Sequence, residues 1–207
     1  MSIVATVAFL CTAFQADCPW IRCAPVKVTC DDPAGWTLSV EPLKADAGRS
    51  GLVVRGRADS ARPAPPLLVS WRIPQDDAPF RWLVSGGSHA PDWTRQKNDF
   101  LLWMPLDCIY SRAGTNRLTW GARETRRPTV ISCRVHEETC TLDGKLEFNV
   151  NEPVARTNAF DFEVCLDARA VPYYEAVSDM AAWMREDPCL RPPRVPEAAF
   201  EPLYSTW

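Results

Sequence analysis

The stretch Asp161–Asp167, DFEVCLD, decides how the rest of the chain is interpreted, because apolar and polar side chains alternate along it. In an extended chain, successive side chains point to opposite sides. Phe162, Val164 and Leu166 therefore fall on one side, whereas Cys165 and the acidic residues fall on the other. A period of two with apolar residues on one side is typical of a half-buried β-strand.

Similar runs recur on the N-terminal side of this stretch, separated by turn signals such as DDPAG, SRAGTN and LDGK. With DFEVCLD, ten strands are predicted, and no helix is predicted between them. This pattern favours a mainly β fold in which residues 1–167 form a large antiparallel β-sandwich. The predicted strands are Val26–Thr29, Trp36–Val40, Gly51–Ala58, Leu67–Ile73, Phe80–Ser85, Phe100–Pro105, Arg117–Ala122, Thr129–His136, Thr139–Val150 and Ala159–Asp167.

The spacing of the apolar residues changes after the predicted sandwich. Tyr173, Val177, Met180 and Met184 recur at helical spacing, which predicts one amphipathic helix in a linking segment over residues 168–187. Five of the next fifteen residues are proline, so residues 188–202 are expected to form an extended linker. The β-branched and aromatic run LYSTW, residues 203–207, then predicts the first strand of a further domain.

The bulk composition is that of a globular protein. The 207 residues are 46% hydrophobic and 24% charged, with a net charge of −3. A chain of this composition is expected to fold rather than to be disordered. No basic stripe is evident, so we expect no nucleic-acid partner. The apolar stretch Ile3–Phe14 is too short to cross a membrane as a helix, which needs about 20 residues, so no membrane partner is expected. This stretch fits a buried first strand, or a signal peptide over residues 1–16 that would direct secretion.

Nine cysteines are present, an odd number with few close spacings. The cluster Cys18, Cys23 and Cys30 has no nearby histidine, so it does not match a zinc site. Several others lie in strand-like runs, where a thiol behaves as a small buried hydrophobe. We therefore expect reduced structural thiols, which favour the cytoplasm, and neither a metal site nor a cofactor.

Signatures of catalysis are missing. The only histidines are His89 and His136, and no second histidine follows His136 at the spacing of a zinc site. The acidic doublets Asp31-Asp32, Asp76-Asp77 and Glu137-Glu138 suit turns rather than acid–base couples, because adjacent residues on a strand face opposite sides. No catalytic residue is therefore expected within this chain.

Four stretches in series resemble a known family. They are Tyr110–Thr119 (YSRAGTNRLT), Val135–Thr139 (VHEET), Val171–Val177 (VPYYEAV) and Leu203–Trp207 (LYSTW). Together they resemble the N-terminal part of bacterial α-galactosidases (melibiases), which are retaining glycoside hydrolases. In that family a β-supersandwich precedes a (β/α)8 barrel, and a run similar to LYSTW opens the first barrel strand.

The resemblance implies that this chain is an N-terminal domain fragment with a truncated barrel. The parent enzyme would hydrolyse terminal α-D-galactosides with two carboxylates about 5 Å apart. In the family both carboxylates come from later barrel strands, so the chain alone is expected to be inactive. Trp207 is the candidate substrate-binding residue, with packing in the barrel core as its alternative role. Galactosides or oligosaccharides are the expected ligands, and the family's sandwich also serves in oligomers, so a homo-oligomer is a further expectation.

A second hypothesis is a stand-alone carbohydrate-binding β-sandwich. The chain has nine tryptophans, and most such side chains serve packing. Trp82, Trp93 and Trp103 could form a platform on which sugar rings stack. This hypothesis requires two or three of them to be exposed on one face of a sheet.

Overall fold

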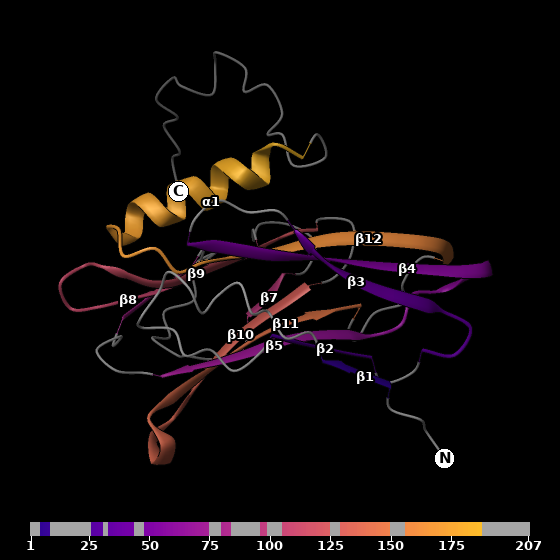
Figure 1. Cartoon of the computed structure of the whole chain (residues 1–207), viewed down its shortest axis with the longest axis horizontal. Helices are drawn as coiled ribbons and strands as arrows, with labels where there is room; N and C mark the ends of the chain where they lie inside the picture. Colours follow the sequence, from indigo (N-terminus) through magenta and orange to yellow (C-terminus); the bar gives the residue numbers. More distant parts are fainter. Residues whose placement is uncertain are drawn as a thin grey trace, which may run out of the picture.

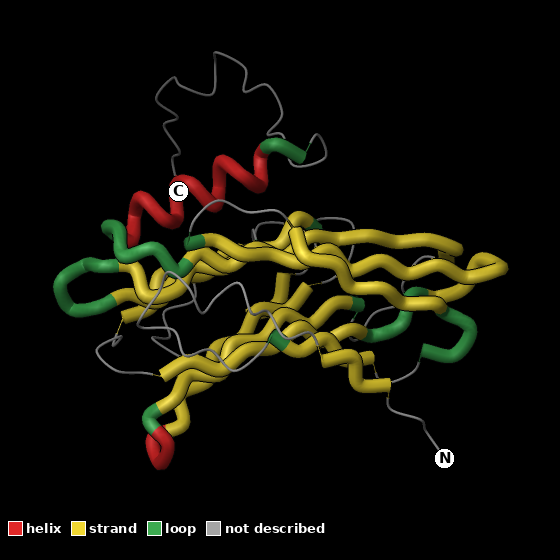
Figure 2. The backbone as a smooth tube through the Cα atoms, viewed as in Figure 1, coloured by secondary structure: helices red, strands yellow, loops and turns green. Residues whose placement is uncertain are grey.

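The computed structural model describes residues 5–8, 26–30, 33–43, 48–74, 80–83, 96–98, 105–124, 129–149 and 156–187. Within these residues, two antiparallel sheets of six strands lie one over the other, and one α-helix covers the outer side of one of them (Figures 1 and 2). The expected mainly β, antiparallel architecture is confirmed. The linker at 188–202 and the barrel strand at 203–207 lie outside the described residues.

The sheet farther from the helix is called the first sheet. Its strands, in spatial order, are β1 (Ala5–Ala8), β2 (Lys27–Cys30), β5 (Leu67–Pro74), β11 (Thr141–Phe148), β10 (Thr129–His136) and β7 (Gln96–Asn98). A short 3-10 helix, η2 (Glu137–Thr139), connects β10 to β11.

The second sheet contains β12, the strand that ends in DFEVCLD. Its strands, in spatial order, are β3 (Thr37–Leu43), β4 (Arg49–Pro63), β12 (Arg156–Asp167), β9 (Asn116–Arg123), β8 (Leu106–Tyr110) and β6 (Phe80–Leu83). The helix α1 (Tyr173–Arg185) follows β12 along the chain.

The main core fills the space between the sheets with apolar side chains from both. The ring of Phe148 on β11 stacks on that of Phe162 on β12, with centroids 3.9 Å apart. Trp71 on β5 meets Trp120 on β9 edge to face at 5.3 Å, a geometry that aromatic pairs favour. Phe162, Val164 and Leu166 all point into this core, which confirms the side assigned to them from the alternation.

The opposite side of β12 is also buried near its end, because α1 packs over it. Cys165 belongs to a second apolar cluster with Leu106, Met180 and Met184. Asp167 is fully buried as well. The strand is therefore half-buried only where Asp161 and Glu163 reach the surface, and the expectation of a half-buried strand is wrong for its last residues.

The helix was predicted correctly, and most strands lie within a few residues of their predicted ranges. Two strands, β7 and β8, were missed. The predicted strand Phe100–Pro105 lies outside the described residues except for Pro105, which forms a bend. Within the stretch Ile3–Phe14, residues Ala5–Ala8 pair with β2 as strand β1. In the part of the chain that is described, no helix is long and apolar enough to cross a membrane.

The buried thiols give a direct chemical test of this packing. Burial raises the pKa of Cys108, Cys133 and Cys165 to about 12 in each case, whereas Cys140 is exposed. Because the thiolate is the reactive form, iodoacetamide at pH 8 should label Cys140 in the native protein at least tenfold faster than the three buried thiols. Peptide mass spectrometry after timed labelling measures this ratio, and labelling in urea should remove the difference. Equal native rates would contradict the packing described.

Candidate functional site

Two of the stretches noted in the sequence meet in the structure, although more than fifty residues separate them. The backbone N–H of Asn116 donates to the carbonyl of Val171 at 2.8 Å, and the N–H of Tyr173 donates to the carbonyl of Gly114 at 2.9 Å. Between them, Thr115 and Pro172 form an isolated β-bridge. The turn before β9 thus holds the segment that starts α1.

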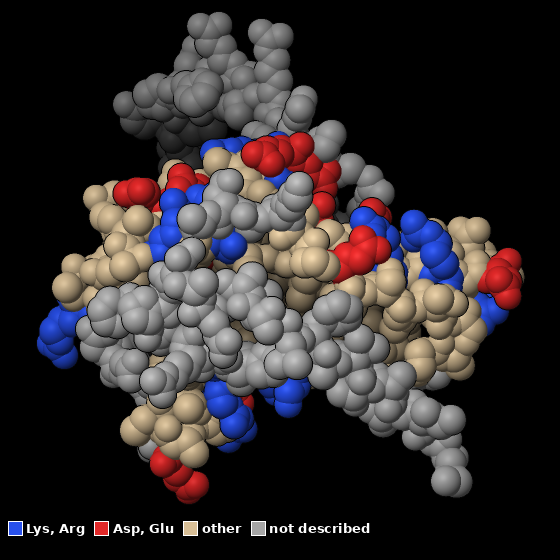
Figure 3. Space-filling model, viewed as in Figure 1, with Lys and Arg blue, Asp and Glu red and all other residues tan. Residues whose placement is uncertain are grey.

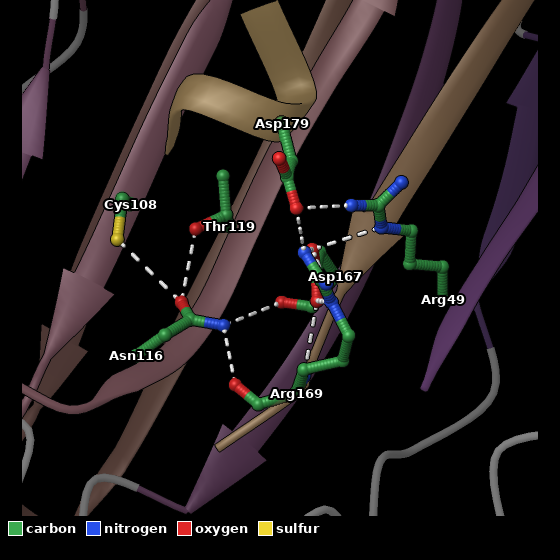
Figure 4. A network of polar contacts seen from close by, with 7 residues as sticks. All are labelled: Arg49, Cys108, Asn116, Thr119, Asp167, Arg169 and Asp179. Atoms are coloured by element: carbon green, nitrogen blue, oxygen red, sulfur yellow. Dashed lines mark hydrogen bonds and ion pairs between the residues drawn. The ribbon is translucent and has the colours of Figure 1, made fainter. Parts of the chain in front are cut away.

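Asn116 completes this connection with its side chain, which is buried (Figure 4). Its Nδ2 group donates to the backbone carbonyls of Asp167, at 3.1 Å, and Arg169, at 2.9 Å. Its Oδ1 atom accepts from the hydroxyl of Thr119 at 2.9 Å. Both ends of the amide are used, so a carboxylate or an apolar side chain would leave a buried polar group unsatisfied.

Two arginines and two aspartates form an ion-pair network beside Asn116. Arg49 on β4 donates through Nε to Asp167 at 3.1 Å and through Nη2 to Asp179 on α1 at 2.7 Å. Arg169 likewise contacts Asp167 through Nη2, at 2.6 Å, and Asp179, at 2.7 Å. The hydrogen bond to Asp167 raises the pKa of Arg169 above its usual value. Arg49, Asn116, Asp167, Arg169 and Asp179 are called the helix joint below.

A separate set of contacts holds the C-terminal end of α1. Arg123 on β9 donates through Nε to the carbonyl of Trp183 at 2.9 Å, and its guanidinium carbon lies 4.2 Å from the centre of the Trp183 ring. The same guanidinium pairs with Glu163 on β12 and Glu186 after the helix. A cation near the last carbonyls of a helix is also favourable for the helix dipole. The helix is therefore fastened to the second sheet at both ends.

Aromatic rings line the surface next to the start of α1. Tyr110 stacks on Tyr173 with centroids 4.1 Å apart, and Phe80 stacks on Tyr110 at 5.5 Å. Tyr174 meets Tyr173 edge to face. Phe80 and Tyr174 are 41% and 65% exposed. These four residues are called the aromatic strip below.

Four of the described aspartates, Asp107, Asp143, Asp167 and Asp179, form ion pairs with arginine. Asp107 is fully buried against Arg81, and burial raises its pKa to about 6 although the hydrogen bonds from Arg81 act in the opposite direction. A raised pKa can mark a catalytic acid, but this side chain is not exposed to solvent. Asp167 and Asp179 are each shared by two arginines. Among the described residues, no group of histidine, cysteine and acidic side chains could hold a metal ion.

The structure gives the positions of two other residues noted in the sequence, Trp82 and His136. Trp82 is half-buried and packs against the apolar cluster beneath α1, so it does not stand on an exposed platform. His136 ends β10 and lies 2.9 Å from Asp143. Trp207, Trp93, Trp103, His89 and the doublets Asp31-Asp32 and Asp76-Asp77 lie outside the described residues.

Sequence reasoning missed the helix joint itself. Asp167 was recognised only as the end of an alternating strand, and Arg49, Arg169 and Asp179 were not noted. The one available signal was a charged residue closing DFEVCLD just before the helix. Its partner Arg169 follows two residues later, but its other partner, Arg49, is 118 residues away, and no local pattern relates the two.

Replacing Asp167 tests the helix joint. The substitution Asp167→Asn removes a fully buried charge and leaves two arginines with Asp179 alone, so we expect a loss of about 3 kcal/mol in the free energy of unfolding. Asp161→Asn is the matched control, because Asp161 lies on the same side of β12 and is exposed; it should change stability by less than about 0.5 kcal/mol. Urea unfolding measures both values. Hydrogen exchange should also show lower protection of the α1 amides in Asp167→Asn, and equal behaviour of the two variants would contradict the assigned role.

Compared with known proteins, the chain matches no family, no curated protein and no solved structure.

Proposed function

We propose that this chain is the N-terminal β-sandwich domain of an α-galactosidase-like glycoside hydrolase, and that α1 leads from the sandwich to the catalytic barrel. One observation carries the proposal. Gly114 and Asn116 lie in one stretch that resembles the family, Val171 and Tyr173 lie in another, and backbone hydrogen bonds join the two stretches. Residues that resemble one family in two separate places thus form a single structural unit.

The way α1 is held suits an element that positions another domain. Relative domain motion is the default where a connection is loose. Here a backbone hydrogen bond to Gly114 holds the start of α1. The helix joint holds its middle through Asp179, and Arg123 holds its last turn. These contacts therefore fix the position of α1 on the second sheet. In this proposal the sandwich is a non-catalytic support for the barrel.

The arginine contacts of four carboxylates support the proposal that the sandwich itself is not catalytic. Retaining glycosidases need one carboxylate as a nucleophile and a second as acid and base, about 5 Å away. Asp107, Asp143, Asp167 and Asp179 are all engaged by arginine. Both reactive carboxylates would come from the barrel, and Trp207 would place its ring against the sugar at the end of the first barrel strand.

Enzyme assays on two lengths of polypeptide test the proposal. The 207-residue chain should not release p-nitrophenol from p-nitrophenyl α-D-galactoside above background. The polypeptide read from the gene beyond codon 207 should release it at least a thousandfold faster. Its Asp179→Asn variant should lose activity on warming earlier than the wild type, because the helix joint is weakened. Hydrolysis by the 207-residue chain alone, or a longer reading frame without a barrel, would contradict the proposal.

A second candidate function is favoured by the aromatic strip. Exposed aromatic rings can bind sugars by stacking, so the strip is compatible with a carbohydrate-binding β-sandwich. Affinity electrophoresis in gels with soluble galactan would then show retardation of the chain. Tyr174→Ala should abolish the retardation, whereas Glu175→Ala, the neighbouring exposed position without a ring, should not. Free migration of the wild type would exclude this candidate for galactans.

A further inference from the structure

The outer face of the first sheet carries a small depression on the side of the molecule opposite α1. It is half open, holds about 200 Å³, and is lined by Lys27, Ser70, Arg72, Asp143 and Lys145, with Trp71 and Gly144. Figure 1 shows the strands β2, β5 and β11 that supply these residues on the side away from the helix. Lysine and arginine side chains are visible along that lower edge of the molecule in Figure 3. The five polar residues are called the basic depression below.

Strand register brings the two lysines to either side of Ser70. Lys27 on β2 pairs with Ser70 on β5, and Ser70 pairs on its other side with Lys145 on β11. Neighbouring strands are about 5 Å apart, so the two lysine backbones lie about 10 Å from each other with a hydroxyl between them. Both lysine side chains are exposed. The long side chains of Lys27 and Lys145 can therefore reach a single ligand group that lies over Ser70.

The next row of side chains supplies a fixed guanidinium. Arg72 donates to Asp143 through Nε at 2.5 Å and through Nη2 at 2.8 Å, which leaves its Nη1 group for another acceptor. Nε2 of His136 also lies 2.9 Å from the Asp143 carboxylate. The hydrogen bond from Arg72 lowers the pKa of Asp143, so this carboxylate stays ionised and serves to orient Arg72.

The charges around the depression do not balance. Lys27, Arg72 and Lys145 contribute three positive charges, and Asp143 contributes one negative charge. Within the described part of the chain, no carboxylate forms an ion pair with Lys27 or Lys145. Arg134 on β10, opposite Asp143 on its other side, adds a further exposed cation. This excess stands out on a chain whose net charge is −3, and it attracts anions.

We propose that the basic depression binds an oxyanion, with the two lysines and Arg72 as charged donors and Ser70 as a neutral donor. Cationic N–H groups form short, strong hydrogen bonds to phosphate, sulfate and carboxylate oxygens. The volume is smaller than that of a typical drug-sized ligand site, so it suits a single anionic group on a small molecule. Phosphate, sulfate and the carboxylate of an acidic sugar share this chemistry.

Nuclear magnetic resonance of labelled lysines tests the proposal directly. The chain has only four lysines, Lys27, Lys44, Lys97 and Lys145, and reductive methylation with ¹³C-formaldehyde labels each while keeping its charge. Inorganic phosphate, sulfate and glucuronate are titrated in separate experiments, with sodium chloride added to hold the ionic strength constant. We expect saturable shifts of the Lys27 and Lys145 signals with at least one anion, while Lys44 and Lys97 stay unchanged. The anion that saturates at the lowest concentration identifies the class of group.

Paired variants provide the control. Calorimetric titration of the double variant Lys27→Gln/Lys145→Gln should show at least tenfold weaker binding of that anion. The double variant Arg112→Gln/Arg156→Gln removes the same charge from exposed positions outside the first sheet and should bind within twofold of the wild type. Circular dichroism establishes that both variants are folded. No shift with any of the three anions, equal shifts at all four lysines, or equal weakening in both double variants would overturn the proposal.

Discussion

The buried carboxylate of Asp167, held by Arg49 and Arg169, is the interaction on which the arrangement of sheet and helix depends. Removing such a charge from water costs several kcal/mol, so a buried ion pair is seldom a net source of stability relative to an apolar pair. The ion pairs of Asp167 contribute here by fixing the orientation of α1. Charged groups with fixed geometry accept one placement of α1, whereas the apolar contacts of Met180 and Met184 would tolerate several.

Strand β12 lies inside the second sheet and has buried side chains on both of its sides. One side of it carries Phe162, Val164 and Leu166 into the core between the sheets, and the other carries Cys165 and Asp167 beneath the helix. The two outer faces of the sandwich consequently differ. The second sheet is covered by an amphipathic helix, while the first presents the basic depression.

Local patterns in the sequence predicted much of this fold, and the reasons for the failures are physical. Period-two alternation identified the side of β12 that faces the core between the sheets, and helical spacing identified α1. Strand β8 was missed because the sequence LDCIY contains Asp107, which points into the interior and is neutralised by Arg81 from β6. Such compensation over 26 residues leaves no local signal.

The basic depression left no local signal in the sequence either. Lys27 and Lys145 become neighbours only through the pairing of β2, β5 and β11. The turn before β9 and the start of α1 were both noticed, but only the structure brings them into contact.

The attachment of α1 at both of its ends has a mechanical consequence. A pull or twist applied to the chain at Asp187 is carried through Arg123 to β9 and through Asp179 to β4 and the end of β12. These strands are neighbours in the second sheet, so three paired strands share the load. Because contacts at its start, middle and end tie α1 to the second sheet, we expect the helix and this sheet to unfold together.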